Sequence, residues 1–210
     1  MKVLLVNGSP HEKGCTYTAL QEVANTLNTN QIEPEIMWLG AKPIAGCIGC
    51  GTCIKTGRCF ISDKVNEFLE KVPENDGFVF GSPVHFAAIS GGLSSFLDRV
   101  FYGRRKLFSN KLGAGIVSCR RGGATTSWDE INKYFGMNNM PIVTSQYWNM
   151  VHGTNPEEVK KDEEGMQTMR TLANNMAWLL KCIEAGKNVG IEFPKNEEII
   201  ATNFIPKMKE

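Results

Sequence analysis

The spacing of apolar residues predicts strands that alternate with helices along this chain. Short apolar runs predict five buried strands, at residues 3–6, 35–39, 77–81, 112–117 and 141–144. Between these runs, apolar residues recur at three- and four-residue intervals, which is the spacing of one helix face. Such stripes predict helices over residues 16–27, 65–72, 92–102, 131–135 and 156–185.

Strands that alternate with helices indicate a parallel sheet covered by helices on both faces. Right-handed crossovers leave few topologies, and we expect the flavodoxin-like strand order 2-1-3-4-5. The predicted fold is therefore α/β, a three-layer, doubly wound, five-stranded parallel sheet. One domain is expected at residues 1–186, including a cysteine-rich loop at residues 40–62, and a polar tail follows at residues 187–210.

Composition narrows the class of protein. Of the 210 residues, 42% are hydrophobic and 21% are charged, which is ordinary for a globular domain. The formal net charge of +1 predicts no general attraction to nucleic acid or to an anionic membrane. No apolar run reaches the roughly 20 residues that a bilayer requires. The run at residues 3–6 is too short for a signal-peptide core, so we expect a cytoplasmic protein.

The segment after the first predicted strand, residues 7–18, has the composition of an anion site. Ligands of doubly wound sheets bind beyond the carboxyl ends of the strands, where helix N-termini offer free N–H groups. Gly8 and Gly14 allow close backbone approach, and Ser9, Thr16 and Thr18 add hydroxyl donors. This pattern is neither a dinucleotide glycine motif nor a Walker loop, and its neutral donors suit the phosphate of FMN. Taken alone, the segment also fits an ordinary turn whose Ser and Thr residues cap the helix.

Two further loops follow neighbouring strands of the predicted sheet. Residues 82–86 follow the third strand, where Pro83 stiffens the turn and His85 and Phe86 offer planar partners for a flat ring. Residues 118–123 follow the fourth strand, where an arginine or a backbone N–H would stabilise negative charge on a reduced isoalloxazine. Three such loops at adjacent strand exits favour a bound flavin over an isolated anion.

Four of the seven cysteines lie within thirteen residues, with the spacing Cys47-x2-Cys50-x2-Cys53-x5-Cys59. An odd cysteine count in a cytoplasmic chain does not suggest a disulfide framework. Three interpretations stay open: a [4Fe–4S] cluster held by four thiolates, a structural zinc site, and reduced thiols without metal. Zinc motifs more often use two separated Cys-x2-Cys pairs, so zinc ranks below the cluster.

In combination, these motifs resemble those of the NAD(P)H-dependent FMN reductase family of flavodoxin-like proteins. The resemblance rests on Gly8-Ser9-Pro10 with Gly14 and Thr16, on Gly81-Ser82-Pro83-Val84, and on Phe96-Leu97-Asp98-Arg99. Within that family, the four-cysteine spacing is similar to that of the iron–sulfur flavoproteins, which carry a [4Fe–4S] cluster beside FMN. The resemblance also implies a homodimer or homotetramer.

The resemblance further implies which residues contact FMN. Ser9, Thr16 and Thr18 match the phosphate-binding positions, and residues 83–86 match the segment that lines the isoalloxazine. The expected cofactor contacts are Ser9, Pro10, His11, Cys15, Thr16, Tyr17, Thr18, Ser82, Pro83, Val84, His85, Phe86, Ser118, Arg120, Gly122 and Gly123. The expected cluster ligands are Cys47, Cys50, Cys53 and Cys59.

Two functions from different classes are consistent with this sequence. The first is an enzyme in which NAD(P)H passes hydride to FMN and then leaves the site. A small acceptor, such as a quinone, an azo or nitro compound or free flavin, then binds in place of NAD(P)H and is reduced. The chemistry belongs to FMN, so we assign no catalytic residue. The second is an electron carrier in which a cluster passes single electrons between ferredoxin and FMN.

Overall fold

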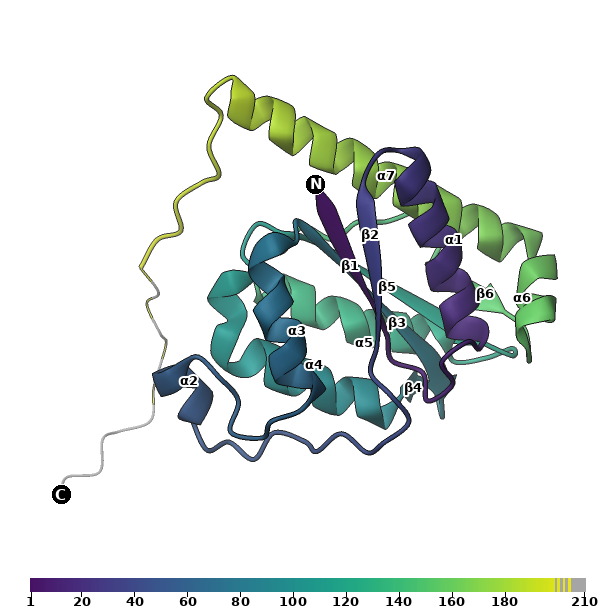
Figure 1. Cartoon of the computed structure of the whole chain (residues 1–210), viewed down its shortest axis with the longest axis horizontal. Coiled ribbons are helices and arrows are strands. Elements are labelled where there is room, and N and C mark those ends of the chain that lie inside the picture. Colours follow the sequence, from purple (N-terminus) through teal and green to yellow (C-terminus); the bar gives the residue numbers. More distant parts are fainter. Residues whose placement is uncertain (199, 201, 203, 205–210) are drawn as a thin grey trace.

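A central sheet lies between two layers of helices. The computed structural model describes residues 1–198, 200, 202 and 204. Figure 1 shows α1 (Cys15–Thr29) and α7 (Glu163–Asn188) over one face of the sheet, and α3 (Lys64–Lys71), α4 (Gly91–Arg104) and α5 (Ala124–Met137) over the other. Two 3-10 turns, η1 (Val72–Glu74) and η2 (Arg105–Leu107), follow α3 and α4. This is the three-layer α/β arrangement that the sequence predicts.

Five strands form a parallel sheet in the order β2-β1-β3-β5-β6. They are β1 (Lys2–Asn7), β2 (Glu33–Trp38), β3 (Gly77–His85), β5 (Leu112–Cys119) and β6 (Met150–His152). A sixth, two-residue strand, β4 (Ala88–Ile89), pairs antiparallel with the end of β3. Counted among the parallel strands alone, the order is 2-1-3-4-5, so the predicted topology is confirmed.

The alternating side chains of the strands build one core on each face of the sheet. Phe78 and Phe80 of β3 belong to the core under α3, α4 and α5, whereas Val79 between them belongs to the core under α1 and α7. Phe68 of α3 packs against both phenyl rings, with ring centroids 5.6 and 5.8 Å apart. Because both faces are packed, the strands are fixed, and so are the positions from which the loops at their carboxyl ends begin.

The fifth strand does not lie at residues 141–144, as its apolar run predicts. Within that segment, which the structure describes in full, Ile142 forms an isolated bridge to β5 and no strand follows. The next carbonyl of β5 that faces this edge, that of Gly115, instead accepts hydrogen bonds from the side chains of Asn149 and Trp128, at 3.1 Å each. These side chains replace strand pairing, and pairing with β5 resumes only at β6.

In two segments, the helices differ from those that the sequence predicts. The helix expected at residues 156–185 is two helices, α6 (Pro156–Lys161) and α7, because Asp162 between them leaves the helical conformation, with φ −74° and ψ 80°. Its carboxylate accepts a hydrogen bond from the Gly165 N–H at 2.9 Å and so caps α7. The loop expected at residues 40–62 contains a short helix, α2 (Thr52–Thr56).

The polar tail expected at residues 187–210 begins inside α7, which runs on to Asn188. Residues 199, 201, 203 and 205–210 of that tail lie outside the described residues. None of the described helices is both long enough and apolar enough to cross a membrane.

Candidate functional site

The segment between β1 and α1 is a tight loop organised by Asn7. This residue is fully buried, and its amide nitrogen donates to the Glu12 carbonyl at 2.9 Å while its oxygen accepts from the Ser9 N–H at 3.0 Å. The Ser9 hydroxyl accepts from the His11 N–H at 3.1 Å, and no described group accepts the hydroxyl's own proton. The Trp38 indole donates to the Ser9 carbonyl at 2.9 Å. The sequence carries no local signal for the contact of Trp38, whereas an Asn directly after a buried strand, as Asn7 is, is a common turn signal.

This loop leads into α1, whose N-terminus carries no side-chain cap. Gly14 occupies the N-cap position, and among the described residues no side chain accepts a hydrogen bond from the first-turn N–H groups. The first turn also contains no acidic residue. Such an N-terminus attracts anions through its N–H groups and the helix dipole. The alternative in which Ser or Thr caps this helix is therefore excluded, and the loop fits a phosphate.

The predicted hydroxyl donors differ in what they contact. Thr16 Oγ1 lies 2.8 Å from Ser118 Oγ, so one hydroxyl donates to the other and the second proton is left for a ligand. Thr18 Oγ1 donates to the Gly14 carbonyl at 3.1 Å. The Tyr17 hydroxyl donates to a side chain one turn further along α1. Thr16 and Ser118 are therefore better placed than Thr18 and Tyr17 to donate to a phosphate.

The exits of β1, β3 and β5 meet at one edge of the sheet. The Gly8 N–H donates to the Gly81 carbonyl at 2.9 Å, and Pro83 is the register partner of Ser118. A Cβ at Gly8 would lie 2.9 Å from that same carbonyl oxygen, and a Cβ at Gly81 would lie 2.9 Å from the Thr16 side chain. The close approach of these loops therefore requires glycine at both positions, and it brings the three predicted loops together.

After Gly81, β3 continues to His85 and returns as a short hairpin. Phe86 and Ala87 form its tip with φ of 51° and 59°, and the Phe86 side chain is fully exposed. The Thr126 hydroxyl of α5 donates to the Ala87 carbonyl at 2.8 Å. A Cβ on Gly123 would lie 2.7 Å from the Ala87 Cα. The hairpin tip is thus held against the loop after β5, and it presents an aromatic ring at the predicted flavin edge.

The remaining predicted contacts lie at the same edge with different exposure. Ser82 is fully buried, and its hydroxyl donates to the Pro83 carbonyl at 2.8 Å and accepts from the Ser90 N–H at 2.9 Å, so it holds the hairpin. Cys15 is half-buried at the start of α1, and burial raises the pKa of its thiol. The other contacts are half-buried or exposed side chains and glycines of the three loops: Pro10, His11, Val84, His85, Arg120 and Gly122.

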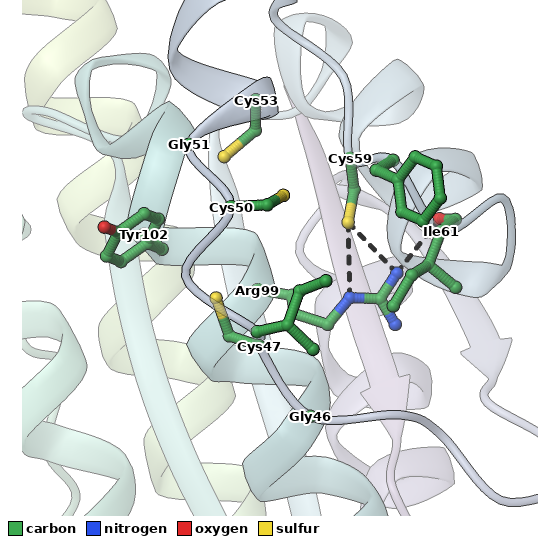
Figure 2. A pocket seen from close by; sticks show the side chains of 11 residues that line it. Gly46, Cys47, Cys50, Gly51, Cys53, Cys59, Ile61, Arg99 and Tyr102 are labelled. Carbon is green, nitrogen blue, oxygen red and sulfur yellow. Dashed lines mark hydrogen bonds between the residues drawn. The ribbon is translucent and has the colours of Figure 1, made fainter.

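The four clustered cysteines surround one pocket beside α4. Figure 2 shows the sulfur atoms of Cys47, Cys50, Cys53 and Cys59 directed toward the same space. Cys47 and Cys50 are exposed, Cys53 and Cys59 are half-buried, and all four are free thiols. Further lining comes mainly from apolar and aromatic side chains: Ile48, Phe60, Ile61 and Tyr102.

The pKa values of two of these thiols are shifted in opposite directions. Cys50 Sγ lies 3.4 Å from Thr52 Oγ1, and hydrogen bonding to Thr52 lowers the pKa of the Cys50 thiol. Burial, followed by the charges of the three neighbouring cysteines, raises the pKa of the Cys53 thiol. Repulsion among neighbouring thiolates is the condition that a bound cation relieves.

Arg99 of α4 closes the buried end of the pocket. Its side chain is 1% exposed, and Nη1 and Nη2 donate to the two carboxylate oxygens of Asp63 at 2.6 and 2.8 Å. Nε and Nη2 also donate to Cys59 Sγ at 3.3 and 3.2 Å, and the carbonyls of Ala45 and Ile61 accept further bonds. Burial lowers the pKa of Arg99, but the hydrogen bonds to Asp63 and Cys59 outweigh it, so the pKa is raised and the guanidinium stays charged. In the sequence, Arg99 stands out only as part of the Phe96–Arg99 family motif, and nothing there predicts its contact with the cysteines.

Two further residues position the cysteines. Asn66 of α3 is 2% exposed; its side chain accepts from the Cys59 N–H at 2.9 Å and donates to the carbonyls of Cys59 and Ile61 at 3.0 and 3.1 Å. Gly103 of α4 lies so close to Cys53 that a Cβ there would be 2.8 Å from the Cys53 Cβ and closer still to its sulfur. Sequence spacing carries no signal for either role, because each acts across elements that are separate in the chain.

The cysteine pocket fits a polynuclear cluster better than a single ion. Zinc requires its thiolates at about 2.3 Å from one centre. In the part of the chain that the structure describes, no three His, Cys, Asp or Glu side chains converge on such a point. A cubane cluster binds each thiolate to a different iron, so its ligands surround a volume. The N–H donors at Cys59 also suit a group that carries negative charge.

Comparison with known proteins shows the family of this chain. The model of the NADPH-dependent FMN reductase family matches residues 1–155. An iron–sulfur flavoprotein of Methanocaldococcus jannaschii is 34% identical over 196 residues, covering 88% of this chain and 100% of its own. An iron–sulfur flavoprotein of Archaeoglobus fulgidus is 29% identical over 204 residues, covering 90% of this chain and 98% of its own. RosB, crystallised with the intermediate 8-demethyl-8-formylriboflavin-5'-phosphate, covers 100% of this chain and 98% of its own with a TM-score of 0.67 and 15% identity, which shows a shared flavodoxin-like fold.

Proposed function

This chain belongs to the NADPH-dependent FMN reductase family, and from that premise we propose that it is an iron–sulfur flavoprotein that transfers electrons. In this proposal, Cys47, Cys50, Cys53 and Cys59 hold a [4Fe–4S] cluster, and the loops after β1, β3 and β5 hold FMN. A bound flavin exchanges electrons singly or in pairs, whereas a cluster exchanges them singly.

One observation carries the proposal: four thiols enclose one pocket whose buried end is a charged guanidinium that donates to a sulfur. Unliganded thiols in a loop do not require an Arg–Asp pair that is itself 1% exposed on the Arg side. Burying such a pair costs several kcal/mol in desolvation unless other charges or hydrogen bonds compensate it. The hydrogen bonds to Asp63 and to two carbonyls offset much of that cost, and a negatively charged cluster beside Cys59 would add to the compensation.

The chain's own residues bind and orient the flavin. The uncapped N-terminus of α1 receives the phosphate, with hydroxyl protons from the Thr16–Ser118 pair and from Ser9. The hairpin at the end of β3 supplies Pro83, Val84, His85 and Phe86 along the ring. A hydrogen bond from the Thr126 hydroxyl to the Ala87 carbonyl ties that hairpin to α5.

The electron carrier and the alternative function, a reductase, differ in their electron donor, which is ferredoxin for the carrier and NADPH for the reductase. The relatives are named iron–sulfur flavoproteins, which favours a cluster beside the flavin. A protein with both groups can act as a carrier that receives single electrons from a partner such as ferredoxin. The description of the family favours the other function, in which NADPH reduces the flavin and a small acceptor is reduced in turn. We place the carrier first because the cysteine pocket serves it directly, and the reductase second. For the assembled protein we propose a homodimer or homotetramer.

The donors can be compared by following flavin absorbance under anaerobic conditions. We expect reduced ferredoxin to reduce the flavin faster than NADPH does. Cys47→Ser should abolish the ferredoxin route and leave the flavin bound, while Cys182→Ser, an exposed cysteine of α7 outside the pocket, should behave as the unmodified protein does. Rapid reduction by NADPH together with an unchanged Cys47→Ser variant would establish the reductase instead.

A further inference from the structure

Cys59 differs from the other three pocket cysteines in its hydrogen-bond donors. Its sulfur receives two N–H groups of Arg99, at 3.3 and 3.2 Å. Within the described residues, Cys50 has one side-chain partner, the Thr52 hydroxyl, and the sulfurs of Cys47 and Cys53 receive no side-chain hydrogen bond. Side-chain N–H···S bonding in this pocket is therefore concentrated on one ligand.

The guanidinium that makes these bonds is held in place from several sides. Asp63 accepts from both Nη atoms, and the Asp63 carboxylate also accepts from the Val65 N–H at 3.1 Å, which caps α3. The Ala45 carbonyl also accepts from Nη1, and the Ile61 carbonyl shares the N–H groups of Nη2 with Asp63 and Cys59. An ammonium cannot reproduce this planar set of donors, so lysine is not equivalent to arginine here.

We propose that Arg99 is a positioning residue that fixes Cys59 as a cluster ligand and raises the reduction potential of the cluster through its two N–H···S hydrogen bonds. This inference rests on the proposed function. Reduction adds one electron and no proton, so the site gains one negative charge. The electron comes from a one-electron reductant such as reduced ferredoxin. Donors aimed at a ligand sulfur stabilise that added charge, and hydrogen bonds to the sulfurs are among the factors that set cluster potentials.

The neighbouring Asp63 carboxylate determines whether the N–H donors of Arg99 or its positive charge contribute more to the cluster potential. Asp63 lies within 2.8 Å of both Nη atoms and offsets the positive charge of the guanidinium at longer range. The direct N–H···S bonds are therefore the main contribution, and net charge is the smaller one. This gives opposite expectations for two substitutions in one ion pair.

An anaerobic potentiometric titration with dithionite, followed by the paramagnetic signal of the reduced cluster, tests this inference. Arg99→Lys keeps a cation and loses the planar donors, so we expect the ratio of reduced to oxidised cluster at a given potential to fall about tenfold, which for one electron is about 59 mV. Asp63→Asn keeps the donors and removes a negative charge, so the potential should rise. Arg58→Gln is the matched control, because Arg58 is next to Cys59 in sequence but exposed and paired with Glu70 at 2.5 Å; it should shift the potential far less.

The outcomes separate the two proposals. If the unmodified protein contains no iron, the proposed function fails. If Arg99→Lys retains its iron and its potential equals that of the unmodified protein, the inference fails while the proposed function stands. If Arg99→Lys and Asp63→Asn both lose cluster, or both shift the potential in the same direction, Arg99 is only structural, and the inference is overturned as well.

Discussion

Thr16 Oγ1 lies 2.8 Å from Ser118 Oγ, although the two residues are 102 positions apart in the sequence. Both side chains are buried. Their contact joins the start of α1 to the end of β5, two of the three loops that the sequence assigns to the flavin. Only one of the two hydroxyl protons is used in this contact, so the other is available to a ligand at the uncapped N-terminus of α1.

Replacing Thr16 with valine should therefore weaken FMN binding. The substitution preserves shape and removes one donor to a charged phosphate, a bond worth about 1.5–3 kcal/mol, so the dissociation constant should rise at least about tenfold. Thr18→Val is the control, since the Thr18 hydroxyl is already bonded to the Gly14 carbonyl. Fluorescence titration of the apoprotein with FMN measures both. Equal affinities for the two variants would argue against the assignment of the phosphate to the Thr16–Ser118 pair.

Gly103→Ala should impair cluster assembly. Alanine favours a helix over glycine by about 1 kcal/mol, but its Cβ here would overlap the side chain of Cys53. We expect lower iron content without loss of folding. Gly136→Ala in α5, where a Cβ meets nothing within 4 Å, should keep full iron and gain stability. Iron analysis and thermal unfolding of both variants are the measurements, and a fully loaded Gly103→Ala protein would count against the position of Cys53.

Asn66→Ala should destabilise the protein by about 3 kcal/mol. The substitution leaves the N–H and the carbonyl of Cys59 without their side-chain partner, whereas the Ile61 carbonyl keeps its bond from Arg99. Unsatisfied buried groups cost about 1–3 kcal/mol each. Asn25→Ala, at an exposed position of α1, should change the stability by less than about 0.5 kcal/mol. Urea unfolding provides the comparison. Similar losses in the two variants would show that Asn66 does not hold the segment around Cys59.

Tyr134 predicts an alkaline dependence of stability. Burial, then the hydrogen bond that its hydroxyl donates to Asp98 at 2.5 Å, raise the pKa of Tyr134 well above its usual range. The folded chain keeps a proton that the unfolded chain releases near pH ~10, so this stabilisation is present below that pH and is lost as the pH rises further. Tyr134→Phe should unfold more easily at pH ~8, yet lose less stability between pH ~9 and ~11. Urea unfolding across that range, with the exposed Tyr147→Phe as control, checks the slope; parallel pH profiles for all three proteins would contradict the assignment.

Local sequence patterns predict the frame of this molecule well. The run at residues 3–6 and the stripe of Leu20, Val23 and Leu27 depend on burial period alone, and both form as expected. The apolar run at residues 141–144 misleads because side-chain hydrogen bonds from Asn149 and Trp128 take over the strand edge. No local pattern reports such a competition.

In the candidate site, too, some residues can be predicted from local sequence and others cannot. The three loops that we assign to the flavin are visible in sequence because each is a strand exit with a local composition of glycine, proline and hydroxyl residues. The partners of the cysteines are not, because Arg99 and Asn66 reach Cys59 from two different helices, 40 and 7 positions away. Their roles depend on how α3 and α4 pack, which only the structure shows.

The central claim is that one chain holds both FMN and a cluster at the four cysteines. Its most direct test is the iron, acid-labile sulfide and flavin content of protein purified without oxygen, before and after Cys59→Ala. We predict about four iron atoms per FMN in the unmodified protein, and full FMN with little iron in the variant. A yellow preparation with no iron, or iron that survives the substitution unchanged, would contradict the account.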